Sequence, residues 1–151
     1  MDRFLACWFS GFAKSLDKID TTSRTEILRA CGVACANSYT AEIFSDAKRR
    51  SQDLESFLAN LSAAFSGAAY DMVGDHAIRV RFSDCDCDLV QADFVRFPHL
   101  CECSLFNLKE SVERALGVPA AVSMAATILR GGTCCEFAVT WPEEPLWRAY
   151  P

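Results

Sequence analysis

Apolar residues near the start of the chain recur every three or four positions. This spacing is typical of a helix with one apolar face. It predicts a core-facing helix over residues 3–19, whose apolar stripe consists of Phe4, Leu5, Trp8, Phe9, Phe12 and Leu16.

Three more helices are expected before residue 66. Ser23 and Glu26 have capping-box spacing, so we expect the second helix to begin at Ser23. A short helix should cover Ala41 to Arg50. The fourth helix has an apolar face at i, i+3 and i+4, made of Leu54, Phe57, Leu58, Leu61 and Phe65.

The hydrophobic period then changes from helical spacing to alternation. Gly74 and Asp75 are typical of a tight turn between two strands. In the second of these strands the apolar residues Ile78, Val80 and Phe82 alternate with Arg79 and Arg81. Such a strand packs one face on a core and leaves its arginines on a solvated face.

The last third of the chain predicts one helix and a hairpin. Ser104 is a candidate N-cap and Gly117 a candidate C′ residue for the helix. Gly131 and Gly132 supply the hairpin turn. One strand of the hairpin has the apolar face Val122, Met124, Ala126 and Ile128, and its partner has Cys135, Phe137 and Val139.

These elements predict an α+β fold in one domain over residues 1–151. The N-terminal helices pack on a small antiparallel sheet, and one further helix precedes the C-terminal hairpin. The length of 151 residues is sufficient for a hydrophobic core that is stable without disulfides or structural metals.

Charge and hydropathy exclude two classes of protein. The net charge of −5 and the isoelectric point near 5.0 argue against a nucleic-acid binder, which normally carries a basic patch. The longest apolar run of the first helix, Phe4–Ala13, is too short to cross a bilayer, so we expect no membrane partner. A homo-oligomer is compatible with the sequence.

The cysteine content points to a reducing compartment. The chain has nine cysteines, and an odd number excludes complete pairing within one chain. The eleven phenylalanines supply a core that disulfide scaffolds usually lack. We therefore expect a cytoplasmic protein whose thiols are free or bound to metal.

Seven of these cysteines have spacings that bring their thiols together. Cys31 and Cys35 are i and i+4 on a predicted helix and share a face. Cys85 with Cys87, and Cys101 with Cys103, are Cys-x-Cys pairs whose side chains share one side of an extended segment. The latter pair would open the helix that follows. Cys135, on the last strand, is the seventh candidate.

Converging thiolates are the ligands of tetrahedral zinc and of iron–sulfur clusters. We expect Cys85, Cys87, Cys101 and Cys103 to be the main ligands, with Cys31, Cys35 and Cys135 completing the site or forming a second one. His99 adds a nitrogen ligand near the second pair. The acids Asp84, Asp86 and Asp88 alternate with the cysteines and should point away from them.

Two other interpretations of the cysteines stay open. Free cysteine is often a small buried apolar residue, which would leave a structural or partner-binding domain. Alternatively, Cys101 or Cys103 is the nucleophile of a Cys-dependent hydrolase of small heterocyclic or thio-substrates, with His99 as its base.

The stretch "CECSLFNLKESVERALGVPAAVSMAATILRGGTCCEFAV" resembles the C-terminal half of 4-vinyl-reductase-type domains and their small bacterial relatives. The stretches "CGVAC", "AEIFSDAK" and "DLESFLANL" are similar to uncharacterised Cys-rich bacterial proteins, and the C-terminal pattern is also similar to the L-2-amino-thiazoline-4-carboxylic acid hydrolase-like family. The shared C-terminal features fall on Cys101, Cys103, Gly117 to Pro119, Gly131-Gly132 and Cys135-Glu136-Phe137.

The resemblance implies an α+β ligand-binding domain with cysteines as metal ligands. Many such domains carry a Glu and a Cys on the strand before the glycine turn, where this chain has Met124 and Thr127. A role assigned to that Glu does not transfer. The leading hypothesis is therefore a thiolate-rich domain of sensory or carrier type that binds a metal, such as zinc or an iron–sulfur cluster, or a small molecule.

Overall fold

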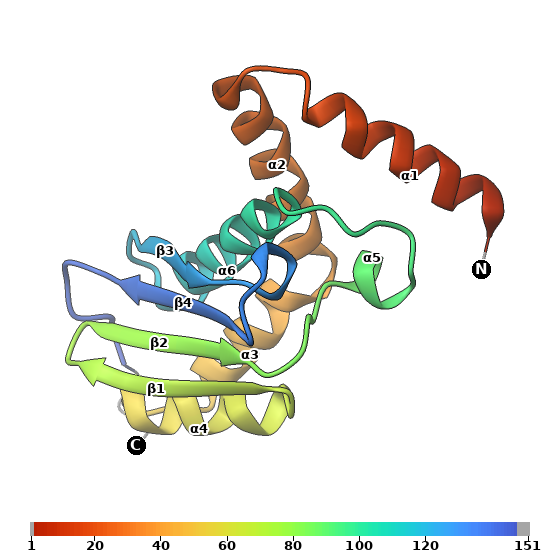
Figure 1. Cartoon of the computed structure of the whole chain (residues 1–151). Coiled ribbons are helices and arrows are strands. Elements are labelled where there is room, and N and C mark those ends of the chain that lie inside the picture. The colour runs from red at the N-terminus through yellow and green to blue at the C-terminus, as the bar shows by residue number, and fades with distance from the viewer. Residues whose placement is uncertain (1, 148–151) are drawn as a thin grey trace.

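The computed structural model describes residues 2–147 and has the expected order of helices and strands (Figure 1). The helical elements are α1 (Arg3–Leu16), α2 (Thr21–Cys35), the π-helical turn η1 (Ala36–Thr40), α3 (Ala41–Arg49), α4 (Leu54–Ala64), α5 (Asp88–Gln91), α6 (Leu100–Leu116) and the 3-10 turn η2 (Ile128–Arg130). The strands are β1 (Ala68–Gly74), β2 (Ala77–Phe82), β3 (Ala121–Ala126) and β4 (Cys135–Thr140).

The four strands form one antiparallel sheet in the order β1-β2-β4-β3. The expected α+β fold is thus confirmed, with helices α3, α4 and α6 behind the sheet in Figure 1. The predicted turn at Gly74 and Asp75 joins β1 to β2. Ile128 was expected in the third strand but lies in η2, because that strand ends at Ala126.

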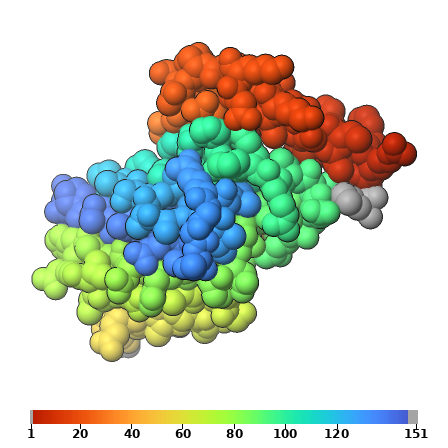
Figure 2. Space-filling view, in the orientation of Figure 1, coloured from red at the N-terminus to blue at the C-terminus, as the bar shows by residue number. Residues whose placement is uncertain are grey.

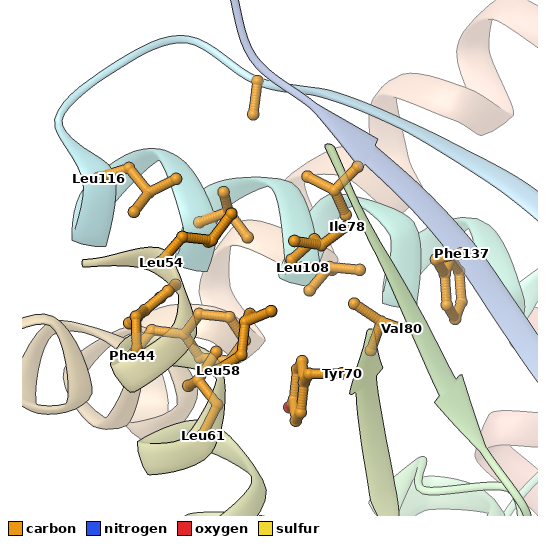
Figure 3. Packing of buried hydrophobic residues seen from close by; sticks show 14 of the residues in the cluster. Phe44, Leu54, Leu58, Leu61, Tyr70, Ile78, Val80, Leu108, Leu116 and Phe137 are labelled. Carbon is orange, nitrogen blue, oxygen red and sulfur yellow. The ribbon is translucent and has the colours of Figure 1, made fainter. Parts of the chain in front are cut away.

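The inner face of the sheet and three helices enclose the main core (Figure 3). On the sheet, Tyr70 pairs with Val80 and Val80 pairs with Phe137 across neighbouring strands, so their side chains share one face. Phe44 from α3 and Leu61 from α4 pack against this face. On the outer face, Asp71 forms ion pairs with the arginines of β2.

Helices α2 and α3 are joined through η1 without a break in helical backbone, since Cys35, Ala36, Thr40 and Ala41 all have right-handed helical angles. A π-helical turn inserts an extra residue and rotates the side chains that follow it. The expected cap at Ser23 is wrong by one turn. Helix α2 begins at Thr21, and Asp20 is its N-cap, accepting a hydrogen bond from Ser23 N at 2.9 Å.

Helix α1 differs most from the expected pattern. It projects beyond the rest of the molecule in Figures 1 and 2. Phe4, Leu5 and Trp8 are exposed, and of the helix only Ala13 and Leu16 are buried. The prediction of a core-facing stripe is wrong for these three residues, whereas Phe9 is half-buried and contacts the ring of Phe94. The buried end joins a small second core with residues of α2, α5 and α6.

Among residues 2–147, no helix combines the length and hydropathy needed to cross a membrane.

Candidate functional site

A cavity of about 370 Å³ lies between the main core and the second core. Its walls come from α2, η1, α3 and α6 on one side and from the sheet and the segment around α5 on the other. Most of its surface is apolar, with the aromatic and aliphatic side chains Phe44, Phe65, Tyr70, Phe82, Leu89, Leu100, Leu108, Leu129 and Phe137.

Seven of the nine cysteines line this one cavity. They are the seven that spacing selected: Cys31, Cys35, Cys85, Cys87, Cys101, Cys103 and Cys135. Cys7 and Cys134 are not part of the lining. Segments far apart in the sequence thus deliver their thiols to the same space, although their roles as metal ligands stay a prediction.

The two thiols of the pair Cys101 and Cys103 do not share a side, contrary to expectation. Helix α6 begins at Leu100 and not at Ser104, so both residues lie within its first turn. Side chains two residues apart on a helix point in different directions, because each residue turns the backbone by about 100°. Cys101 is buried and Cys103 is partly exposed.

Cys103 belongs to a group of thiols that includes Cys31, Cys35 and Cys87. Burial, followed by repulsion from Cys35, Cys31 and Cys87 in that order, raises the pKa of the Cys103 thiol to about 12. Burial also raises the pKa of Cys87, whose neighbours include Cys85 and Cys35. Cys31 and Cys35 are exposed, which places this group at the rim of the cavity.

Cys101 belongs with Cys85 and Cys135 instead. Burial raises the pKa of Cys101, while the neighbouring Thr127 side chain and the charge of Arg130 partly offset this shift. Burial also raises the pKa of Cys135, against a hydrogen bond that Ile128 N donates to its sulfur at 3.5 Å. The thiols around the cavity therefore form two groups that adjoin at Cys85 and Cys87, and each Cys-x-Cys pair contributes one member to each.

A close approach of α2 and α6 positions the rim group. A Cβ atom built on Gly32 would lie 2.4 Å from the carbonyl oxygen of Cys103 and 2.7 Å from Cβ of Phe106. Only glycine allows the two backbones to come this close. The crossing sets Cys31 and Cys35, which flank Gly32 on α2, beside Cys103 on α6.

The rim is acidic. Tyr39 donates a hydrogen bond to Oδ2 of Asp88 at 3.2 Å, and burial together with this carboxylate raises the pKa of Tyr39 to about 12. Partial burial raises the pKa of Asp86, with repulsion from Asp88 adding to the shift. Asp86 and Asp88 line the cavity together with the cysteines, so the expectation that they point away is wrong for both.

Among the described residues that line the cavity there is no Lys, Arg or His. Its polar groups are carboxyl, hydroxyl, amide and thiol, which favour a neutral or positively charged occupant. Within residues 2–147 no group of three or more His, Cys, Asp or Glu side chains is arranged to hold a metal ion. A four-coordinate zinc site is therefore not preformed here.

His99 lies outside the cavity lining. Its Nδ1 is 3.1 Å from Oε1 of Glu102, and its Nε2 is 3.8 Å from Oδ1 of Asp17. Both ring nitrogens thus face carboxylates, and the raised thiol pKa values at Cys101 and Cys103 make these residues weak nucleophiles at neutral pH. This geometry does not support a Cys–His hydrolase.

The sequence analysis did not assign Tyr39, Thr40, Ser104 or Asn107 to the site, although these polar residues line the cavity. Tyr39 and Thr40 lie on η1, whose π-helical turn directs them into the cavity. Asn107 Nδ2 donates to Oγ1 of Thr40 at 3.0 Å, which ties α6 to η1. A signal for a π-helical turn within "ANSYT" is absent from simple periodicity, because the same residues fit an ordinary helix.

Comparisons with known proteins show the fold. No family model matches the chain, and no curated protein matches it in sequence. One similar solved structure is subunit 3 of a trafficking protein particle complex from Naegleria fowleri, covalently bound to palmitic acid. It has 12% identity and a TM-score of 0.57 and covers 95% of this chain and 96% of that chain.

A second similar structure is the phenol-responsive sensory domain of the transcription activator PoxR with phenol. Its identity is 11% and its TM-score 0.56, over 91% of this chain and 74% of that chain. The chain therefore has the α+β fold of these two proteins over most of its length. Membership in the family of 4-vinyl-reductase-type domains stays a prediction.

Proposed function

We propose that the chain is a small-molecule-binding domain of sensory or carrier type, whose ligand occupies the cavity between the two cores. The main support for this proposal is the cavity. Its volume of about 370 Å³ is within the range of about 300–1,000 Å³ that ligand pockets usually have, and its lining joins apolar walls to a few polar groups.

The two similar structures support an apolar occupant. One is described with phenol and the other with palmitic acid, which are both largely apolar molecules. The aromatic wall formed by Phe44, Tyr70 and Phe137 offers the same kind of surface here. The hydroxyl groups of Tyr39 and Thr40 are placed to orient one polar group of a ligand.

The test is a fluorescence titration with the neutral apolar probe N-phenyl-1-naphthylamine, followed by displacement with phenol. The expected result is saturable binding that phenol reverses. Ser104→Trp places a large side chain on the cavity wall and should weaken binding by about tenfold or more, since a filled pocket cannot bury the probe. Leu129→Trp fills the cavity from another wall and should act likewise.

Arg114→Trp is the matched control, because Arg114 is exposed on the same helix and lies outside the cavity lining. It should bind the probe as the wild type does. Unsaturable binding by the wild type, or equal binding by both cavity-filling variants and the control, would rule the cavity out as the ligand site.

The acidic side chains of the lining predict that the cavity binds neutral ligands more tightly than anionic ones. Phenol should displace the probe at lower concentration than benzoate, which has similar size but carries a carboxylate. Benzoate would lie near Asp86 and Asp88 with no described cation in the lining to offset its charge. Displacement curves at low salt measure this directly, and benzoate binding as strongly as phenol would show that the acidic rim does not face the ligand.

A further inference from the structure

The rim of the cavity holds four thiols that an apolar ligand does not require: Cys31, Cys35, Cys87 and Cys103. They come from three segments, namely α2, α6 and the loop before α5. Cys31 and Cys35 are exposed, whereas Cys87 and Cys103 are partly covered. The group is therefore open to solvent on one side and continuous with the cavity on the other.

The close crossing of α2 and α6 at Gly32 brings the thiols of α2 next to the thiol of Cys103 on α6. The backbones of α2 and α6 approach so closely there that a Cβ on Gly32 would meet the Cys103 carbonyl oxygen at 2.4 Å. Cys35 follows Gly32 by almost one helical turn, so it faces the same helix as Gly32 does. Cys35 and Cys103 thus lie on adjoining turns of two tightly packed helices.

Charge around the rim favours a cation. Asp86 and Asp88 lie on the same lining, and no described Lys, Arg or His balances them there. Thiolate sulfur is a soft ligand and selects soft cations such as Cu(I), whereas carboxylates alone would select hard ions.

We propose that Cys35 and Cys103 bind a soft monovalent cation of the Cu(I) type at the rim, with Cys31 and Cys87 flanking it. Two thiolates in a near-linear arrangement satisfy such an ion, so the site needs no preformed group of three ligands. Binding forms two Cu–S bonds and releases two thiol protons to the buffer, and no electron is transferred.

This inference goes beyond the proposed function, because a neutral apolar ligand does not require the rim thiols. It also differs from the expected zinc or iron–sulfur site at Cys85, Cys87, Cys101 and Cys103. On helix α6 the side chains of Cys101 and Cys103 point in different directions, and Cys101 has Cys85 and Cys135 as its thiol neighbours.

The experiment is an anaerobic titration of the reduced full chain with Cu(I), in competition with the chromophoric chelator bicinchoninate. The wild type should withdraw one Cu(I) per chain. Cys35→Ser and Cys103→Ser should each lower the affinity by about tenfold or more, since each removes one of the two ligands. Cys7→Ser and Cys134→Ser, which change thiols outside the lining, should bind as the wild type does.

The double variant Cys101→Ser with Cys135→Ser separates the two thiol groups and should keep the wild-type affinity. If Cys103→Ser fails to fold, the exposed pair Cys31→Ser with Cys35→Ser tests the same site, because neither side chain is buried. Bound Cu(I) should also protect Cys35 of the wild type from alkylation, as read by mass spectrometry.

Three results would overturn the inference. One is a wild type that cannot compete with the chelator. Another is wild-type affinity in Cys35→Ser, Cys103→Ser and the Cys31/Cys35 double variant alike. The third is a loss in the Cys101/Cys135 variant as large as the loss in Cys35→Ser. Binding of the neutral apolar probe, measured on the same samples, shows separately whether the proposed function holds.

Discussion

Cys103 illustrates how burial changes the chemistry of a single residue. Its side chain lies on the wall of an apolar cavity, and its neighbours Cys35, Cys31 and Cys87 would all repel a thiolate there. With a pKa of about 12, the thiol is almost completely protonated at neutral pH. The residue is thus poorly suited to attack an electrophile, and a cation that binds its sulfur has to displace the proton.

This protonation predicts slow alkylation. In the reduced, metal-free protein at pH 7.5, iodoacetamide should modify Cys103 more slowly than the exposed Cys7 by about tenfold or more, because the thiolate is the reactive form. Time-resolved peptide mass spectrometry measures both rates in one sample. Unfolding in urea should make the two rates similar, and similar rates already in the native protein would contradict the assigned environment.

A second prediction at this scale concerns alkaline pH. Burial raises the pKa of Tyr70 and of Cys135 in the folded protein. In the unfolded chain these groups ionise near their ordinary values of about 10 and 8.5. Their contribution to stability is therefore fully present below about pH 8.5 and decreases as the pH rises, because the unfolded state loses protons first.

Urea unfolding of the reduced protein at pH 7, 9 and 10.5 measures this effect, and the free energy of unfolding should fall at each step. Tyr70→Phe should make the decrease between pH 9 and 10.5 smaller, since it removes one of the groups. A free energy that stays constant to pH 10.5 would show that neither side chain is held in its neutral form.

Helix α6 shows what element-scale reasoning from sequence can and cannot provide. Its C-terminus was predicted correctly, because Gly117 adopts the left-handed conformation with φ of 71°. Its N-cap was predicted five residues too late, at Ser104 and not at His99, since serine is a good capping residue by type. The actual start has no side-chain cap, and the buried Cys101, Leu108 and Val112 continue one apolar face back beyond Ser104.

Helix α1 was mispredicted for a different reason. Its apolar spacing is helical, and the helix is present, but periodicity does not say what covers the apolar face. Phe4 and Trp8 are 72% and 54% exposed, because the helix extends past the elements that cover its last turn.

The crossing of α2 and α6 gives a prediction at the scale of elements. Gly32→Ala should destabilise the protein by about 1–3 kcal/mol, because its Cβ would overlap the Cys103 carbonyl and Phe106 and force the helices apart. Gly11→Ala on α1 is the matched control, since a Cβ there meets nothing within 4 Å. The control should be neutral or stabilising by up to about 1 kcal/mol, as alanine favours helix.

Denaturant unfolding of both variants measures these differences. A neutral Gly32→Ala would mean that the two helices are not in close contact, and it would remove the geometric basis of the rim thiol group. Wider separation in the variant should also weaken Cu(I) binding, whereas Gly11→Ala should leave it unchanged.

On the scale of the whole molecule, the cavity joins residues that are far apart in the sequence. Spacing and composition selected the seven cysteines that line it, and local pairing at Cys31 and Cys35 followed from helix geometry alone. The division of the thiols into two groups did not follow, because it depends on how α6 packs against α2 and η2. Nor did the sheet order β1-β2-β4-β3, which depends on long-range contacts that local patterns do not encode.

The central claim, that the cavity between the two cores is the ligand site, is tested most directly by NMR mapping of bound phenol. Aromatic and methyl resonances of Phe44, Phe137 and Leu108 should shift on titration, since all three line the cavity. Shifts confined to the exposed Phe4 and Trp8 of α1, with the cavity residues unchanged, would contradict the account and place the apolar ligand on the surface of α1.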